Sequence, residues 1–189
     1  CPQLEDLRID GHSTADQHEI LAAISHLPCL RDLWLMIDIA ALDKLQGSLR
    51  SAPGLRSLTL HIRGEGPAPD FPLAGVQRVE LSGSWAVMTQ IVSTGRSLRT
   101  VSVANSAYAE APSAGEVEEF ARVLSTLPAL RHFENESLFH VPEEEMRVIA
   151  RRLERVGKWR RERRSSRVCV VHKVSGGSPS SPSPVYPDC

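Results

Sequence analysis

The sequence predicts an α/β repeat fold in which parallel strands alternate with outer helices. A phrase of three apolar residues, separated first by two residues and then by one, recurs along the chain. Its last two apolar residues lie two positions apart, the spacing of side chains on one face of a strand. Between phrases the apolar spacing changes to about 3.6 residues, which indicates helices. The copies are Leu4-Leu7-Ile9, Leu30-Leu33-Leu35, Leu55-Leu58-Leu60, Val76-Val79-Leu81 and Leu98-Val101-Val103, with a weaker sixth at Leu130-Phe133 in which Asn135 takes the last place.

The period of the phrase identifies the kind of repeat. Its first residues are 26, 25, 21, 22 and 32 positions apart, and four of these values fall within the roughly 20–29 residues of leucine-rich repeats. We therefore predict a leucine-rich-repeat-like solenoid with helices on one, convex side, since each unit must stack on its neighbours to bury its apolar face. A doubly wound sheet with helices on both faces is the competing architecture. The expected strands lie near 5–10, 31–36, 56–61, 77–82 and 99–104.

Helices are expected between the strands, with one exception. Residues 64–73 contain three prolines and two glycines, which exclude a helix and predict an extended crossover. Two expected helix starts carry a capping box, at Thr14–Gln17 and at Ser113–Glu116. The expected apolar helix faces lie within 20–27, 42–49, 87–92, 117–127 and 143–156.

Charge and composition divide the chain into three parts. We expect the repeat domain at 1–157, a basic segment with a possible edge strand at 158–174, and a disordered Ser/Pro-rich tail at 175–189. Residues 158–189 carry a net charge of +5 and the preceding part −6. Because the first phrase begins at the first residues, without an initiator Met or a secretory signal, the chain is interpreted as a fragment of a longer array.

Several classes of protein are not expected from this sequence. No stretch approaches 18 apolar residues, so no membrane span is predicted. No catalytic, phosphate-binding or dinucleotide-binding fingerprint occurs, and the four cysteines form no metal-ligand spacing. We therefore expect no enzyme activity, no cofactor and no metal, with reduced thiols and a cytoplasmic or nuclear location.

The uncovered sheet face is the expected binding surface. Residues flanking the two strand-spaced apolar positions should point to this concave face, where a large apolar side chain needs an explanation. Trp34 and Met36 are of this kind, and Trp is a common interface anchor. The candidate partner-binding residues are Asp32, Trp34, Met36, Thr59 and His61. The alternative is that Trp34 packs under a neighbouring loop or under a preceding part of the array.

Two basic features have two interpretations each. Arg31, Arg56, Arg99 and Arg131 share one repeat position and would form a cationic rung, which either holds an acidic or phosphorylated partner or is a solvated rim with local ion pairs, such as Arg31 with Asp32. The run 158–167 is either a nuclear-localisation or nucleic-acid patch or a solvated end of the preceding helix.

Phrases such as Leu27-Pro28-Cys29-Leu30-Arg31-Asp32-Leu33-Trp34-Leu35 resemble the degenerate leucine-rich repeats that follow an F-box in many fungal proteins. The resemblance covers about residues 1–156. It implies the substrate-recognition part of an F-box-type ubiquitin-ligase receptor, joined to a cullin-RING adaptor only through an upstream F-box that this chain lacks. The standard repeat has Asn or Cys eight residues after the first apolar residue of the phrase. This chain departs from that pattern, since the residues at this position are His12, Asp38, Arg63, Ser84 and Ser106.

The sequence thus favours a protein-interaction scaffold. The alternative is a nuclear or nucleic-acid-associated adaptor that acts through the basic C-terminal segment. Apart from that alternative, we expect a protein partner and neither nucleic acid nor a membrane.

Overall fold

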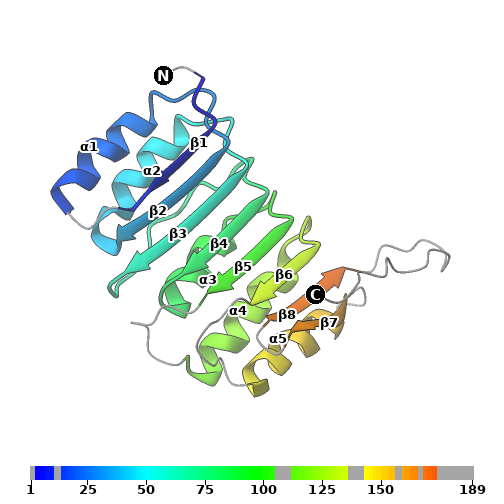
Figure 1. Ribbon diagram of the computed structural model, residues 1–189. Helices are drawn as coiled ribbons and strands as arrows, with labels where there is room; N and C mark the ends of the chain where they lie inside the picture. Colours follow the sequence, from blue (N-terminus) through cyan, green and yellow to red (C-terminus); the bar gives the residue numbers. More distant parts are fainter. Residues whose placement is uncertain are drawn as a thin grey trace.

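The computed structural model of the chain is built on one eight-stranded sheet (Figure 1). It describes residues 3–10, 14–104, 112–135, 143–155, 159–165 and 168–173. The strands are β1 (Asp6–Ile9), β2 (Asp32–Asp38), β3 (Ser57–Arg63), β4 (Arg78–Ser82), β5 (Thr100–Ala104), β6 (His132–Asn135), β7 (Trp159–Ser165) and β8 (Val168–Lys173).

The first six strands confirm the predicted solenoid. They lie in chain order and every neighbouring pair is parallel. All five expected strands are present within a residue or two of their expected bounds, and the weak sixth phrase forms β6. Because crossovers between parallel strands are right-handed, connections that advance in one direction across a sheet lie on the same face, as in a leucine-rich repeat.

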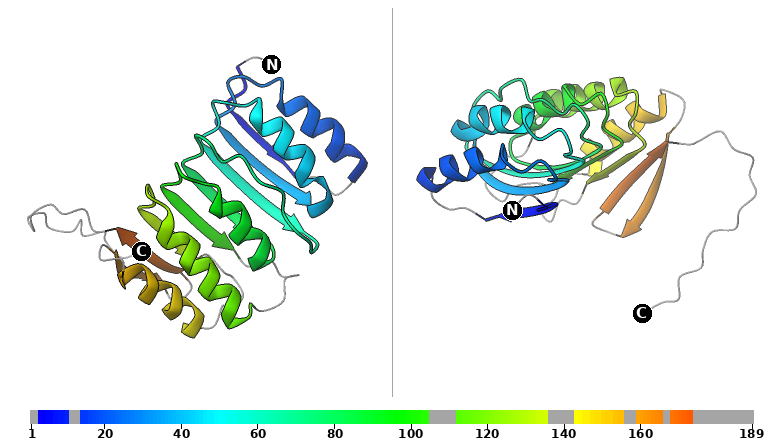
Figure 2. Two further views of the ribbon diagram at one scale, coloured as in Figure 1. Left: turned by 180° about the vertical axis from the view of Figure 1, so that it is seen from behind. Right: turned by 90° about the horizontal axis from the view of Figure 1, so that it is seen from above.

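Helices cover only one face of the sheet. Figure 2 shows α1 to α5 together on one side, which excludes the doubly wound alternative among the described residues. The capping box at Ser113 and Glu116 is formed, whereas the side chains of the one expected at Thr14–Gln17 lie outside the described residues. The helical segments are α1 (Thr14–Ile24), the 3₁₀ turn η1 (Ile39–Ala41), α2 (Leu42–Arg50), α3 (Trp85–Ser93), α4 (Ala114–Thr126) and α5 (Glu143–Arg155).

The core lies between the sheet and the helices and consists of in-register rows of apolar side chains. The repeated apolar pairs of β2 to β5 all point to the helix side and are almost completely buried. In the last repeat Asn135 stands opposite Val103 in the register and is also buried. One row is Leu33, Leu58, Val79, Val101 and Phe133, and the next is Leu35, Leu60, Leu81 and Val103.

The crossover between β3 and β4 contains no helix, as predicted from its prolines. Its apolar side chains replace the helix in the core, since Ala68, Phe71 and Leu73 are buried. Polar contacts attach it to the helices on both sides: Gln46 of α2 donates to the Asp70 carbonyl, and Gln90 of α3 accepts from the Ala68 amide at 3.0 Å. The crossover is therefore a structural layer of the solenoid rather than a free loop.

The C-terminal strands differ from the expectation. The segment from Val168 was expected as an edge strand, but β8 lies between β6 and β7 and is antiparallel to both. The basic run 158–167, interpreted either as a nuclear-localisation or nucleic-acid patch or as a solvated helix end, forms β7 over residues 159–165 rather than a helix end. A strand rich in like charges suits a sheet edge, because charge discourages pairing with further strands. The apolar run Val168–Val171 takes the interior position. Figure 2 shows the β7–β8 hairpin sloping away on the side of the sheet opposite the helices.

The proposed division of the chain at 157 and 174 stays a prediction. The tail at 175–189 and the end of the predicted last helix at 156–157 lie outside the described residues.

The substitution Leu58→Ala tests the register. Leu58 has no exposed surface and stands in the middle of an apolar row, so the free energy of unfolding should fall by about 2–5 kcal/mol. Thr59→Ala, on the opposite face of the same strand, should change it by less than about 0.5 kcal/mol. Urea unfolding followed by circular dichroism measures both, and similar losses for the two variants would contradict this register.

The substitution Phe71→Ala tests the structural role of the helix-free crossover. Phe71 is 1% exposed, and its truncation should cost about 3–5 kcal/mol if it fills the helix layer. Ala74→Ser, at an exposed position of the same segment, serves as the control in the same unfolding experiment. A loss at Phe71 no larger than at Ala74 would show that the crossover is dispensable for packing.

Candidate functional site

The open face of the sheet carries three in-register rows of side chains. The first strand residue of each repeat starts one row, and residues two and four positions later start the others, because alternate side chains point to the same face. These rows contain Asp6, Asp32, Ser57, Arg78, Thr100 and His132; Arg8, Trp34, Thr59, Glu80, Ser102 and Glu134; and Met36, His61, Ser82 and Ala104.

In the row that contains Trp34, exposure falls from Arg8 on β1 to Ser102 on β5, whereas in the first row Arg78 of β4 is still exposed. Asp6, Arg8 and Asp32 are exposed, while Ser82 and Ser102 are buried at 5% and 2% exposure. The hydroxyl of Ser102 has no hydrogen-bond partner among the described residues. The part of the face that a partner can reach is therefore centred on β1, β2 and β3.

Trp34 is the centre of this accessible part. The Arg8 guanidinium lies over its ring, 4.4 Å from the ring centroid, and the His61 ring lies 5.0 Å away at 46°. Arg8 is the direct cross-strand neighbour of Trp34 and His61 is a diagonal one, which are the positions whose side chains meet on a sheet face. The cation–π contact and the ring contact hold the indole half-buried between β1 and β3.

The environment of His61 favours its neutral form. Burial lowers the pKa of the His61 imidazole, the positive charge of Arg8 lowers it further, and the carboxylate of Asp10 acts in the opposite direction. A neutral imidazole beside Trp34 keeps this part of the surface less polar near neutral pH.

The five predicted partner-binding residues lie on the same face of β2 and β3. Trp34 stands opposite Thr59, Met36 opposite His61, and Asp32 opposite Ser57. Arg8 flanks the strand-spaced Leu7 and Ile9 and so lies on this face, but it is not among the five candidate residues. Arg8 holds the same repeat position as Trp34, and this shared position could have identified Arg8 as a neighbour of Trp34 from the sequence.

The backbones of the predicted arginine rung are aligned at the edge where the chain enters the strands. Gln77 occupies the same repeat position between Arg56 and Arg99. The backbone amide at this position of each repeat donates to a carbonyl of the preceding repeat at 2.7–2.9 Å: Arg31 to Glu5, Arg56 to Arg31, Gln77 to Arg56, Arg99 to Gln77 and Arg131 to Arg99. The ion pair of Arg31 is with Glu5 at 3.6 Å, not with Asp32 as the sequence suggested. Both side chains are more than half exposed, so the pair contributes little stability.

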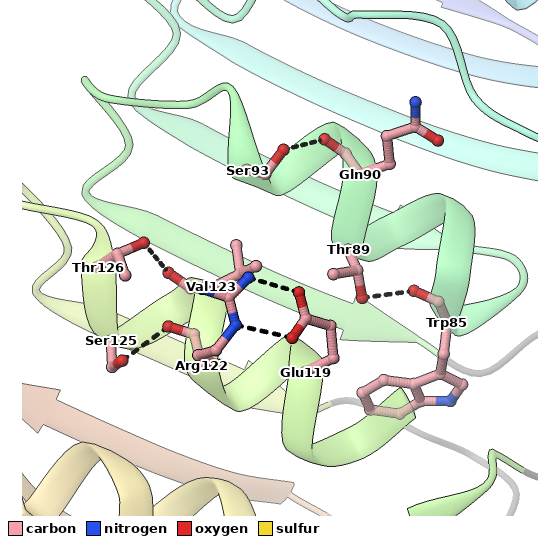
Figure 3. A network of polar contacts seen from close by, with 9 residues as sticks. All are labelled: Trp85, Thr89, Gln90, Ser93, Glu119, Arg122, Val123, Ser125 and Thr126. Carbon is pink, nitrogen blue, oxygen red and sulfur yellow. Dashed lines mark hydrogen bonds and ion pairs between the residues drawn. The ribbon is translucent and has the colours of Figure 1, made fainter. Parts of the chain in front are cut away.

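A groove of about 500 Å³ lies between α3 and α4 on the helix side. Figure 3 shows that its polar groups contact one another: Thr89 and Ser93 donate to carbonyls of their own helix, and Arg122 donates to both carboxylate oxygens of Glu119. These hydrogen bonds lower the pKa of Glu119 and raise that of Arg122. Their partners within the chain make this groove a weaker candidate than the concave face.

The described residues hold no group of three or more His, Cys, Asp or Glu side chains placed to bind a metal. No helix among them has the length and apolar character needed to cross a membrane. The expectations of no metal, no cofactor and no catalysis stay predictions.

No family model matches the chain. No curated protein matches it either. Among solved structures, it is similar to a tropomodulin C-terminal domain from Caenorhabditis elegans, with 12% identity, a TM-score of 0.47, and coverage of 82% of this chain and 85% of that one. It is also similar to leiomodin-1 actin-binding site 2, with 11% identity, a TM-score of 0.48, and coverage of 82% of both chains.

These results correct the resemblance to fungal F-box proteins. Solved structures that match include a tropomodulin and a leiomodin domain, neither of which is an F-box protein. The assignment to the F-box receptors was therefore wrong. The apolar phrase on which it rested reflects how the strands stack, and this stacking does not specify a partner.

A histidine titration tests the geometry around Trp34. The pKa of His61 should lie below its ordinary value of about 6.5, Arg8→Gln should raise it, and Asp10→Asn should lower it further. With a lowered pKa, the imidazole of His61 binds a proton less readily in the folded chain than in the unfolded chain. Its contribution to folding stability should therefore be present above about pH 6.5 and be lost as the pH falls from 6.5 through the lowered pKa. NMR of the imidazole resonances measures the three midpoints. A lower pKa of His61 in the Arg8→Gln variant would contradict the placement of Arg8 beside His61.

Proposed function

We propose that this chain is a non-enzymatic scaffold that binds another protein through the concave face of β1, β2 and β3. The observation that carries this proposal is Trp34, a half-buried indole on a sheet face that no described helix covers. A large aromatic side chain on an open face is costly unless a partner covers it, and Trp is enriched at the energetic centres of interfaces.

The neighbours of Trp34 support this role. Arg8 and His61 already restrict its indole in the free chain, so little side-chain entropy is lost on binding. Met36 stands opposite His61 on the neighbouring strand and is partly buried, and its flexible thioether adapts to an irregular partner. Asp6, Arg8, Asp10 and Asp32 are exposed charges of both signs around this centre, which favour one orientation of the partner over others.

The competing function is a nuclear or nucleic-acid-associated adaptor that acts through the basic segment. Its support is the charge of +5 over residues 158–189. Removing this segment is a poor test, because the deletion takes away β8, the partner of β6. Replacing Arg160, Arg161, Arg163 and Arg164 by Gln lowers the net charge of residues 158–189 from +5 to +1 and leaves the length of the chain intact.

The substitution Trp34→Ala tests the proposed interface. Proteins retained by the immobilised chain from cytoplasmic and nuclear fractions, the compartments expected from the sequence, are identified and the main one purified. Its affinity should fall by about 1 kcal/mol or more in Trp34→Ala, as expected for an interface anchor. Trp34→Phe, which keeps an aromatic ring, should lose less. Thermal unfolding confirms that both variants are folded.

The same variants separate the two functions. The four-fold Arg→Gln variant should bind the protein partner as the unchanged chain does. The opposite outcome is that the chain binds a labelled oligonucleotide, that Trp34→Ala keeps this binding, that the Arg→Gln variant loses it, and that it falls steeply with salt. In that case the scaffold proposal is wrong. Such a salt dependence is the mark of counterions released from phosphates.

A further inference from the structure

A second surface with a different chemistry lies at the rim where the chain enters β3, β4 and β5. It is a cleft of about 320 Å³, at the small end of the range found for ligand sites. Arg56, Gln77 and Arg99 of the rung line it, together with Arg96 and Ser97 from the turn that follows α3. The cleft is separate from the concave face, because none of its lining residues belongs to the rows around Trp34.

The backbone ladder fixes the spacing of the two rung arginines. The Gln77 amide donates to the Arg56 carbonyl at 2.8 Å, and the Arg99 amide donates to the Gln77 carbonyl at 2.7 Å. Neighbouring strands lie about 4.8 Å apart, which places the backbones of Arg56 and Arg99 roughly 10 Å from each other. Two long guanidinium side chains on either side of Gln77 can converge across that gap on one small anion.

The third arginine is presented by a constrained turn. The Arg96 amide donates to the Thr94 carbonyl at 3.1 Å, and the Leu98 amide donates to the Gly95 carbonyl at 3.1 Å. The Thr94 hydroxyl in turn donates to the Phe71 carbonyl, which attaches this turn to the helix-free crossover. The position of Arg96 therefore depends on the same packed layer that replaces the missing helix.

The charge of the cleft is not compensated by the described residues. No acidic side chain lines it, and within the described part of the chain no ion pair involves Arg56, Arg96 or Arg99. The polar contact of the Arg56 guanidinium is a long one, 3.5 Å to the Gly75 carbonyl. By contrast Arg31 pairs with Glu5, and Arg63 with Asp38 at 2.9 Å. Three arginines that line one cleft without a counter-charge favour an anion with several acceptor oxygens.

We propose that this cleft binds the phosphate group of a phosphorylated side chain on a protein. A phosphate monoester accepts bidentate hydrogen bonds from more than one guanidinium, and Gln77 and Ser97 supply further donors. The lining contains no aromatic side chain on which a base would stack. The cleft also has room for a single small anion, whereas a nucleic acid presents an extended row of phosphates. The proposal goes beyond the scaffold function and does not depend on Trp34.

The test uses the full chain and three probes: a capped Ala-phosphoserine-Ala peptide, its unphosphorylated form, and inorganic phosphate. NMR of the arginine Nε–Hε resonances should show saturable shifts at Arg56, Arg96 and Arg99 with the phosphopeptide and with phosphate, and none with the unphosphorylated peptide. The affinity should fall as the pH is lowered from 7.5 to 5, because the phosphate loses its second charge near pH 6.

Matched variants locate the site. Arg96→Gln and Arg99→Gln should each weaken phosphopeptide binding at least tenfold. Arg50→Gln, at the exposed end of α2 and outside the cleft, removes the same charge and should leave the affinity unchanged. Trp34→Ala should also leave it unchanged, so failure of the scaffold proposal and failure of this one are distinguished. Backbone NMR spectra confirm that each variant is folded.

Three results would overturn the proposal. The first is equal binding of the phosphorylated and unphosphorylated peptides. The second is the absence of saturable shifts at the three arginines. The third is tighter binding of a twelve-nucleotide single strand than of the phosphopeptide, lost in Arg99→Gln and steeply weakened by salt, which would assign the cleft to nucleic acid.

Discussion

Parallel pairing of β1 to β6 in one unbroken register is the constraint on which the rest of this protein depends. A shift of one residue between two strands would turn every side chain of one of them to the opposite face. Leu58 would then leave the helix side, and Thr59 would enter the core. No single repeat can bury its apolar pair alone, so the register is maintained by each repeat burying the pair of the next. The rows from Leu33 to Phe133 are the result of this mutual burial.

The same register creates both candidate surfaces. On the open face it places Arg8 beside Trp34 and brings His61 into ring contact with it. At the rim it aligns residues that directly precede the strands, which brings Arg56 and Arg99 to either side of Gln77. One surface is aromatic with mixed charges, and the other is cationic. A protein partner that carries a phosphorylated residue would have complementary chemistry for each, and the two surfaces share no lining residue.

The solenoid tolerates variation in its repeats where the lost contacts are replaced. The crossover at 64–77 has no helix, but Phe71 and Leu73 fill the core and contacts from Gln46 and Gln90 attach it to both neighbouring helices. At the other end, β6 closes its row with the buried Asn135, and the sheet changes from parallel to antiparallel at β8. A charged β7 then forms the edge, where further strand pairing is disfavoured.

The sequence alone determined what repeats. The spacing of the apolar phrase predicted the parallel strands and the face on which Trp34 lies, and the prolines at 67, 69 and 72 predicted the crossover without a helix. These features follow from local geometry, because side chains alternate along a strand and proline cannot continue a helix. The shared repeat position of Arg31, Arg56, Arg99 and Arg131 predicted in the same way that their backbones align at one edge of the sheet.

The tertiary structure decided which of these residues meet. It placed Arg8 over Trp34, paired Arg31 with Glu5 rather than Asp32, and brought Arg96, which is outside the repeated phrase, into the cleft with Arg56 and Arg99. It also inserted β8 between β6 and β7. Such contacts depend on the order of strands across the sheet and on the path of the turns between elements. Neither is encoded in the period of one segment, because long-range neighbours are fixed only when the whole array has stacked.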